Sequence, residues 1–406
     1  MNTGTEPVRP ASGSVTVLGE RHNDLIARAR KVAQIAQENA VAVDAEGRFP
    51  REAFAEIRKQ RLLGCMVPTA LDGEGASLAE VVDICYILGQ ACASTGLTYA
   101  MHQVKMGCIL RHAKGSPALE RILRRIATEQ LLMASSTTEG QAGGNVRASE
   151  AAIEVHGDQV TLERKATVIS YAIDADGIVT TARRSATAAS SDQVLLVLLK
   201  SDYTLERLQV WDSLGMRGTS SEGFTLRVKA SADQVMAEPY ERIHAQTMVP
   251  YAHLLWGSVW AGIAAAATSK AQSFIRHAMR HSNGQPPPAA AHFTQATSSL
   301  RTLRGVLSAA LRGYEAASSD EKAMTSLEFQ SMITMTKVQV SDLAVTTVMS
   351  AMRACGLSGY RNDSEFSIGR HLRDVLSAPI MISNDRILAN LATTALMTPL
   401  PSSIGG

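Results

Sequence analysis

A glycine-rich segment in the first half of the chain has the composition of a ligand-binding loop. Residues 134–146 read ASSTTEGQAGGNV and are small, polar and rich in glycine. Small residues let backbone N–H groups approach an anionic or carbonyl-rich ligand closely. The chain has no GxGxxG or GxxxxGK[ST] sequence, so this is neither a Rossmann nor a P-loop nucleotide site. A ligand loop of another kind and a plain linker between domains both fit this composition.

Two histidines lie in helical sequence with few or no charges. His102 lies in TYAMHQVKMG, and His253 lies within residues 243–269, which contain no Asp, Glu, Lys or Arg. Histidine is the side chain best suited to proton transfer at neutral pH. The alternative for each is a histidine that is hydrogen-bonded within a packed helix face. Residues 243–269 are only modestly hydrophobic, which favours a buried helix over a membrane span.

A charged cluster near the end of the chain is followed by an apolar run. Residues 369–388 read GRHLRDVLSAPIMISNDRIL, in which Arg370, Arg373 and Asp374 precede residues 375–382 that carry no ionisable side chain. Asp385 follows the run and stands at an expected helix start, where Asp is a common cap. A catalytic base in this segment would therefore have to be Asp374 or Asp385.

The composition restricts the classes of function. The 40 basic and 38 acidic residues nearly cancel, and neither sign is concentrated in a run, which argues against a nucleic-acid or membrane-surface partner. The five cysteines form no CxxC pair, so we expect a reduced cytoplasmic protein without a structural metal. Residues 1–20 lack the apolar core of a signal peptide and are predicted to form a flexible arm.

The remaining chain divides into a helical part, a β part and a second helical part. Apolar residues at three- and four-residue spacing predict an N-terminal α-helical domain over residues 21–133, with helices at 23–45, 77–93, 95–114 and 117–128. Alternating residues predict an antiparallel β domain over 134–238, with a hairpin around Gly157 and strands at 177–183, 193–199, 207–211 and 224–229. A C-terminal helical bundle over 239–406 is predicted to have helices at 247–282, 290–318, 320–354 and 382–397. The fold class is therefore α+β.

Four stretches of the chain resemble, in the same order, motifs of the acyl-CoA dehydrogenase superfamily of flavoproteins. Residues 138–145 resemble TEPGAGSD, VISYAIDAD (168–176) resembles WITNAxxAD, and WDSLGMRGTSS (211–221) resembles WGMRGTxS. In the fourth stretch, near the end of the chain, CGLSGY (355–360) and RHLRD (370–374) resemble GGxGY and RxxRD. The resemblance covers residues 20–400 and implies a helical domain, a central β domain and a C-terminal four-helix domain. It also implies a homotetramer or homodimer with FAD at subunit interfaces.

The resemblance also implies which residues contact the cofactor. Ser170 falls where the family has a hydroxyl near flavin N5, while Val168 replaces an aromatic residue. Arg280, with Gly284, resembles RxxFG, whose Arg faces the pyrophosphate of a neighbouring subunit; an Arg fork suits phosphate oxygens. The expected cofactor contacts are Thr138, Gly143, Gly144, Asn145, Ser170, Arg217, Thr219, Arg280, Gly356, Gly359 and Asn384.

The catalytic carboxylate of the family has no counterpart in this sequence. The family most often places this Glu nine residues after the Arg of the RD pair, and that position is Ile382. Some members place it at the start of the first C-terminal helix, and that position is Ala252. Dehydrogenation of an acyl thioester requires such a base to remove the α-proton. Asp385 as a displaced base is the remaining carboxylate alternative.

Three functions remain open on the sequence alone. The first is an FAD-dependent oxidoreductase acting on an acyl thioester of CoA or a carrier protein, with altered base chemistry. The second is a reduced-flavin monooxygenase, with FMN in place of FAD, in which His102, Ser170 and His253 assist the reaction and no Glu is required. The third is a flavin- or acyl-binding protein without turnover.

Overall fold

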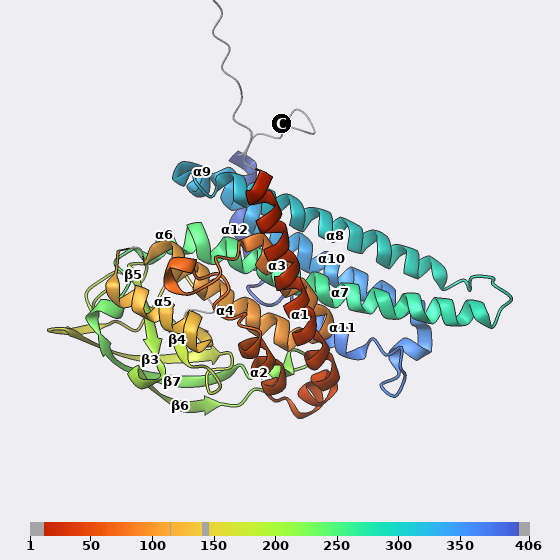
Figure 1. Ribbon diagram of the computed structural model, residues 1–406, viewed down its shortest axis with the longest axis horizontal. Helices are drawn as coiled ribbons and strands as arrows, with labels where there is room; N and C mark the ends of the chain where they lie inside the picture. The colour runs from red at the N-terminus through yellow and green to blue at the C-terminus, as the bar shows by residue number, and fades with distance from the viewer. Residues whose placement is uncertain (1–11, 114, 140–145, 398–406) are drawn as a thin grey trace, which may run out of the picture.

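The computed structural model describes residues 12–113, 115–139 and 146–397. Figure 1 shows three regions, with the β strands at one side, the N-terminal helices across the middle and long C-terminal helices extending to the other side. The predicted order of a helical domain, an antiparallel β domain and a helical bundle is confirmed.

The N-terminal region is built from five helices. Their bounds are α1 (Ser12–Glu46), α2 (Arg51–Lys59), α3 (Leu78–Ala91), α4 (Ala93–His112) and α5 (Pro117–Glu129). The helix expected at 23–45 starts earlier, because α1 already begins at Ser12, and the flexibility of the N-terminal arm stays a prediction. The last proline before this point is Pro10, so no residue after it forces the backbone out of a helix.

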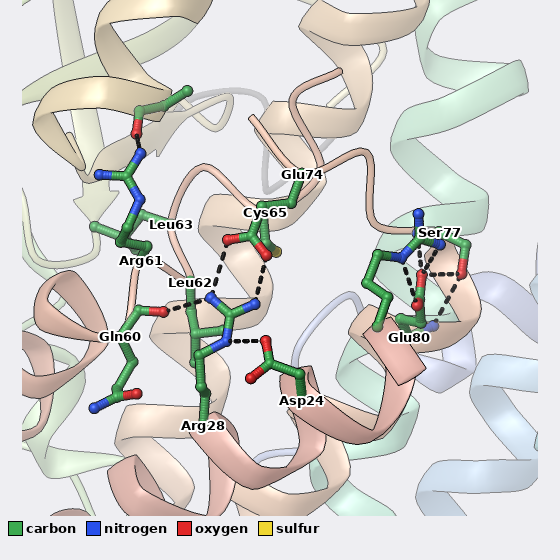
Figure 2. Close-up of polar contacts among 12 residues, drawn as sticks. Asp24, Arg28, Gln60, Arg61, Leu62, Leu63, Cys65, Glu74, Ser77 and Glu80 are labelled. Carbon is green, nitrogen blue, oxygen red and sulfur yellow. Dashed lines mark hydrogen bonds and ion pairs between the residues drawn. The ribbon is translucent and has the colours of Figure 1, made fainter. Parts of the chain in front are cut away.

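A polar network anchors the segment between α2 and α3 onto α1 (Figure 2). Arg28 of α1 donates to the carbonyl of Gln60 at 2.9 Å and to the Glu74 carboxylate, and it forms an ion pair with Asp24. Nearby, Arg21 pairs with Glu80, the residue that completes the capping box at the start of α3. These contacts hold the segment whose Leu62 and Leu63 carbonyl groups accept hydrogen bonds from α4.

The β region consists of two sheets. Their strands are β1 (Met133–Ser136), β2 (Glu154–His156), β3 (Gln159–Ile169), β4 (Gly177–Arg183), β5 (Gln193–Leu199), β6 (Tyr203–Gln209) and β7 (Glu222–Ser231). One sheet has the order β1-β4-β5 and the other β2-β3-β7-β6. The hairpin around Gly157 is confirmed by the pairing of His156 with Gln159. The strand expected at 207–211 begins earlier, at Tyr203, and β1 was not expected; it pairs in parallel with β4, whereas the other pairs are antiparallel.

The C-terminal region is a bundle around a buried central helix. Its elements are α6 (Tyr240–Ile243), a π-helical turn η5 (His244–Met248), α7 (Val249–Arg280), α8 (Ala290–Ala317), α9 (Glu321–Thr325), α10 (Leu327–Tyr360), α11 (Gly369–Val375) and α12 (Asn384–Met397). The helix expected at 320–354 is two helices, because Ser326 caps the start of α10 by accepting from the N–H of Phe329 at 3.1 Å. The last helix begins at Asn384 instead of residue 382, since Ile382 has a positive φ of 53°.

The central helix α7 packs against α3, α4, α8 and α10. Ser258 donates to the carbonyl of Val82, and a Cβ on Gly89 would lie only 2.5 Å from the carbonyl oxygen of Val259. Backbone contact this close requires glycine. The uncharged stretch around α7 is therefore the core of the bundle, and no helix in the described part of the chain is long and apolar enough to cross a membrane.

Candidate functional site

Three hydroxyl groups form a continuous hydrogen-bonded chain between β3 and β7. Ser170 Oγ lies 2.8 Å from Ser221 Oγ, which lies 2.7 Å from Thr219 Oγ1. Thr219 Oγ1 in turn donates to the carbonyl of Met216 at 2.9 Å. Thr219 and Ser221 are buried, whereas Ser170 at the other end is half-buried. Ser170 and Thr219, both predicted site residues, are thus brought together by Ser221, which was not predicted.

Left-handed backbone conformations turn these hydroxyls toward one another. Tyr171 and Ser220 both have a φ of 45°, and the N–H of Tyr171 donates to the carbonyl of Thr219 at 2.9 Å. The β3–β7 ladder also contains an irregularity between Ala166 and Ile169, immediately before Ser170. Non-glycine residues with positive φ and interrupted ladders recur at functional sites.

Two helices that are distant in sequence, α11 and α1, hold the 211–221 segment in place. Asp374 of α11 accepts from the N–H of Met216 at 2.7 Å, and burial raises the pKa of Asp374 to about 6. Arg373 forms an ion pair with Asp44 near the end of α1 and also donates to the carbonyl of Leu214 at 3.1 Å. The RD pair therefore fixes the motif, and Asp374 is a positioning group instead of a free base.

Arg217 is held by backbone carbonyl groups of α1 and of its own motif. Its Nε donates to the carbonyl of Asp44 at 2.7 Å, and its Nη1 donates to the carbonyl of Ser213 at 3.1 Å. A cationic side chain at the last carbonyls of a helix is a favourable C-terminal interaction. Arg217 therefore joins the motif to α1, and its contact with the cofactor stays a prediction.

The vacant base position lies in a turn that is tied to α10 by a buried lysine. The carbonyl of Ile382 accepts from Lys337 Nζ at 2.6 Å, and Asn384 Oδ1 accepts from the same nitrogen at 2.7 Å. Lys337 is fully buried with its ammonium 5.8 Å from the ring centroid of Trp260, and burial lowers its pKa to about 8. Asn384 also donates to Asp342 at 2.9 Å, so Asn384 anchors α12 to α10.

His102 has both ring nitrogens engaged by the backbone. Its Nδ1 accepts from the N–H of Met133 at 3.0 Å, so Nε2 carries the proton and donates to the carbonyl of Leu63 at 2.9 Å. Tyr99 and Gln103 of the same helix both donate to the carbonyl of Leu62. Burial lowers the pKa of His102 to about 4. This geometry supports the packed-histidine alternative, because no ring nitrogen is free for proton transfer.

His253 is also placed in the bundle core. Its Nδ1 lies 2.9 Å from the carbonyl oxygen of Ile333, the side chain is 3% exposed, and burial lowers its pKa to about 4. Its neighbour Ala252 is buried too, and carries no group that could replace the absent carboxylate. Asp385 is exposed in the first turn of α12, and the residue that caps this helix is Ser383, whose Oγ accepts from the N–H of Arg386 at 3.4 Å.

The glycine-rich loop is described only in part. Thr138 is half-buried directly after β1, whereas Gly143, Gly144 and Asn145 lie outside the described residues. Glu139 is buried and accepts from the Ser149 hydroxyl and the N–H groups of Glu150 and Ala151. The start of the loop is therefore fixed by its own carboxylate.

The remaining predicted contacts lie at the far end of the bundle. Arg280 ends α7 and is exposed near the tip of the α7–α8 hairpin, away from the β sheets (Figure 1). Gly356 has a φ of 55° inside α10, where it interrupts the helical backbone, and Gly359 is buried three residues on. Arg280, Gly356 and Gly359 are thus not brought together with Ser170.

The polar groups near the hydroxyl chain fit a flavin. Thr98 Oγ1 of α4 and Ser136 Oγ of β1, on elements that contact one another, are fully buried without a hydrogen-bond partner. Buried polar atoms are normally paired, so these orphans indicate a missing polar ligand. A flavin ring offers both donors and acceptors along its edge. Thr98, Ser136, Ser170 and Thr138 are the residues that would hold it.

Four structurally central residues were not among the predicted site residues. Ser221 lies in a run of small residues that gives no distinct signal, and Asp44 pairs with Arg373, which is 329 residues away in the sequence. Lys105 and Lys337 did carry a signal, since each is a single cation within a long apolar helical stretch.

Comparison with known proteins gives a consistent relationship. The sequence profile of the family described as "Acyl-CoA dehydrogenase, N-terminal domain" matches residues 19–130, and that of "Acyl-CoA dehydrogenase, C-terminal domain" matches residues 254–383. A cyclohex-1-ene-1-carbonyl-CoA dehydrogenase of Geobacter metallireducens is 27% identical over 372 residues, which cover 89% of this chain and 93% of the relative.

Relatives with other activities are equally similar. An L-evernosamine nitrososynthase of a Micromonospora species is 28% identical over 357 residues, covering 83% of this chain and 81% of the relative. The solved structure of FMN-bound TdsC, a dibenzothiophene monooxygenase of Paenibacillus, superimposes with a TM-score of 0.81 at 16% identity, covering 93% of this chain and 98% of TdsC. The structural similarity shows a shared fold, and the relatives span dehydrogenases and oxygenating enzymes.

Proposed function

Because this chain belongs to the acyl-CoA dehydrogenase superfamily, we propose that it is a reduced-flavin monooxygenase that transfers an oxygen atom to a small organic molecule. A bound reduced flavin, FMN or FAD, would supply the two electrons with which molecular oxygen is activated. The observation that carries the proposal is the absence of the family's catalytic Glu, with Ile382 at the usual position and Ala252 at the alternative one.

The surroundings of Ile382 also disfavour base chemistry. The nearest polar group to its carbonyl is the ammonium of Lys337 at 2.6 Å, and with a pKa of about 8 this group is protonated at neutral pH. A protonated amine cannot remove the α-proton of a thioester. The segment therefore offers no free base where a dehydrogenase of this family needs one, because the buried ammonium of Lys337 is held by Ile382 and Asn384.

The direction of the hydroxyl chain favours a ligand that donates. Thr219 donates to the carbonyl of Met216, so the proton of Ser221 is free to point to Thr219 and that of Ser170 to Ser221. In this arrangement the lone pairs of Ser170 Oγ remain available as acceptors. A reduced flavin carries an N–H at N5, whereas an oxidised flavin does not. Ser170 is thus suited to hold the reduced form.

A second function is favoured by the similarity to the Geobacter dehydrogenase, which extends over 89% of this chain. In that case the protein would oxidise an acyl thioester of CoA or a carrier protein with an unconventional base. The assembly expected for either function is a homodimer or homotetramer, with the exposed Arg280 and the Gly356 turn reaching a neighbouring subunit. A cytoplasmic location remains an expectation from the cysteine pattern.

An anaerobic titration separates the two functions. We expect the flavin spectrum of the oxidised holoenzyme to stay unchanged with a panel of acyl-CoAs, and we expect reduced holoenzyme to consume oxygen faster when its substrate is present. Stoichiometric bleaching by an acyl-CoA would instead establish the dehydrogenase. Ile382→Glu serves as the matched variant, because a gain of bleaching only in this variant would identify residue 382 as the vacant base position.

Ser170→Ala tests the hydroxyl chain directly. Removing the acceptor should lower the rate of substrate oxygenation by about 100-fold, the lower end of the roughly 10²–10⁴-fold that a positioned proton-transfer group contributes. Ser170→Thr keeps the hydroxyl and should retain most of the rate. Equal rates in Ser170→Ala and wild type would remove Ser170 from the site.

A further inference from the structure

A buried lysine on α4 lacks a counterion. Lys105 is 3% exposed, and its Nζ contacts the sulfur of Met248 at 3.1 Å, a weak acceptor. Within the described residues, the two groups that shift its pKa besides burial are Arg164 and the neutral thiol of Cys108, and neither is a carboxylate. A buried ammonium without a partner is costly, so its presence calls for an explanation.

A second buried cation with free donors lies within electrostatic range of Lys105. Arg164 of β3 is 1% exposed, and its Nη1 donates to Ser149 and Thr181 and lies 3.5 Å from Glu139 Oε1. The Nε and Nη2 atoms of Arg164 have no partner. Glu139 already accepts from three other donors, so it does not satisfy the rest of the guanidinium.

A third unpartnered donor lies beside these cations. The hydroxyl of Tyr240 on α6 is buried and has no partner, and Arg164 and Cys108 both affect its pKa. Tyr240 begins α6, which directly precedes the π-helical turn η5; this turn carries Met248 and contacts α4. Single π-helical turns occur frequently at functional sites. Arg164 thus lies within electrostatic range of both Lys105 and Tyr240, and the three buried side chains carry several donors and a net positive charge.

We propose that Lys105, Arg164 and Tyr240 form a binding site for an oxyanion, a carboxylate or phosphate group of the substrate. An oxyanion accepts from all three side chains and neutralises the buried charge, which a water molecule or an apolar group does not do. The assignment of this anion to the substrate rests on the proposed function, since α4 also carries Thr98 of the flavin-holding set. The anion site itself is independent of the reaction.

The test measures anion binding without turnover. The thermal unfolding midpoint of the flavin-loaded protein is followed against sodium acetate and against inorganic phosphate, with sodium chloride at equal ionic strength as the reference. We expect a saturable rise for at least one oxyanion. A stronger response to acetate indicates a carboxylate substrate, and a stronger response to phosphate indicates a phosphorylated one.

Variants assign the effect to the site. Lys105→Met should weaken the apparent anion affinity by at least tenfold. Tyr240→Phe should weaken it by a few-fold and should leave the fold intact, because the tyrosine hydroxyl has no hydrogen-bond partner in the described structure. Lys337→Met, which removes the other buried lysine, should leave the affinity unchanged. A wild-type midpoint that follows ionic strength alone, or an undiminished response in Lys105→Met, would overturn the proposal. Neither result depends on whether the enzyme is a monooxygenase.

Discussion

Lys105 and Lys337 are both buried on long helices, and burial lowers the pKa of each to about 8, yet their partners differ in kind. Lys337 donates to two oxygen atoms at 2.6 and 2.7 Å and lies over Trp260. Lys105 has a thioether sulfur at 3.1 Å. Folding can satisfy a buried charge with acceptors of its own or leave the acceptors to a ligand. Lys337 therefore has a structural role, whereas Lys105 indicates a binding site.

The largest effect should come from Lys337→Met. This change leaves the Ile382 carbonyl without its lysine donor, and Asn384 Oδ1 keeps the longer bond from the Ser341 hydroxyl at 3.3 Å. An acceptor that loses its partner costs about 1–3 kcal/mol, so we expect the free energy of unfolding to fall by about 3 kcal/mol. Urea unfolding measures it. The matched control is Lys31→Met on the exposed face of α1, which should stay within about 0.5 kcal/mol of wild type. No loss in Lys337→Met would mean that the turn before α12 does not depend on this lysine.

Lys105→Met should have the opposite sign. Replacing an unpaired buried charge with an apolar side chain of similar length removes a desolvation penalty, so we expect a gain of about 1–2 kcal/mol in the absence of oxyanions. The measurement is again urea unfolding, in chloride buffer. A loss similar to that of Lys337→Met would show that the contact with Met248 suffices, and the distinction between the two lysines would fail.

The smallest effect is a pH dependence of that gain. Lys105 has a pKa of about 8 in the folded protein, against an ordinary value of 10.5, so between these values the unfolded chain binds more protons than the folded one. Wild-type stability therefore rises with pH in this window relative to Lys105→Met. The advantage of the variant should shrink by about 1 kcal/mol between pH 8 and pH 9. A constant difference across this range would mean that Lys105 is already neutral or well paired at pH 8.

Short-range sequence patterns predicted the architecture well, but they did not predict contacts between residues that are distant in the sequence. The strand-like runs at 177–183 and 193–199 give β4 and β5 with the predicted bounds, because both strands are set by their own apolar residues. The strand β1 was missed because its parallel pairing with β4 depends on residues more than 40 positions away.

The residues of the candidate site were also predicted only where short-range sequence patterns indicated them. The motif around residues 211–221 identified Thr219, but the hydroxyl chain needs Ser221, just before β7, to lie beside Ser170, just after β3. His102 attracted attention for its chemistry, yet its environment is set by the carbonyl of Leu63 and the N–H of Met133, which only the folded chain places beside it. Residue type indicates what a side chain can do, and its neighbours decide which of those roles remains.

The ion pair between Asp44 and Arg373 has a consequence for how the protein is made. A ribosome adds about 5–20 residues per second, so Arg373 emerges roughly 15–65 s after Asp44, from which it is separated by 329 residues. Until then the Asp44 carboxylate and the N–H of Met216 lack their partners on α11. The newly synthesised chain thus holds an unfinished interface for most of its synthesis, and the candidate site is completed by one of the last helices to appear.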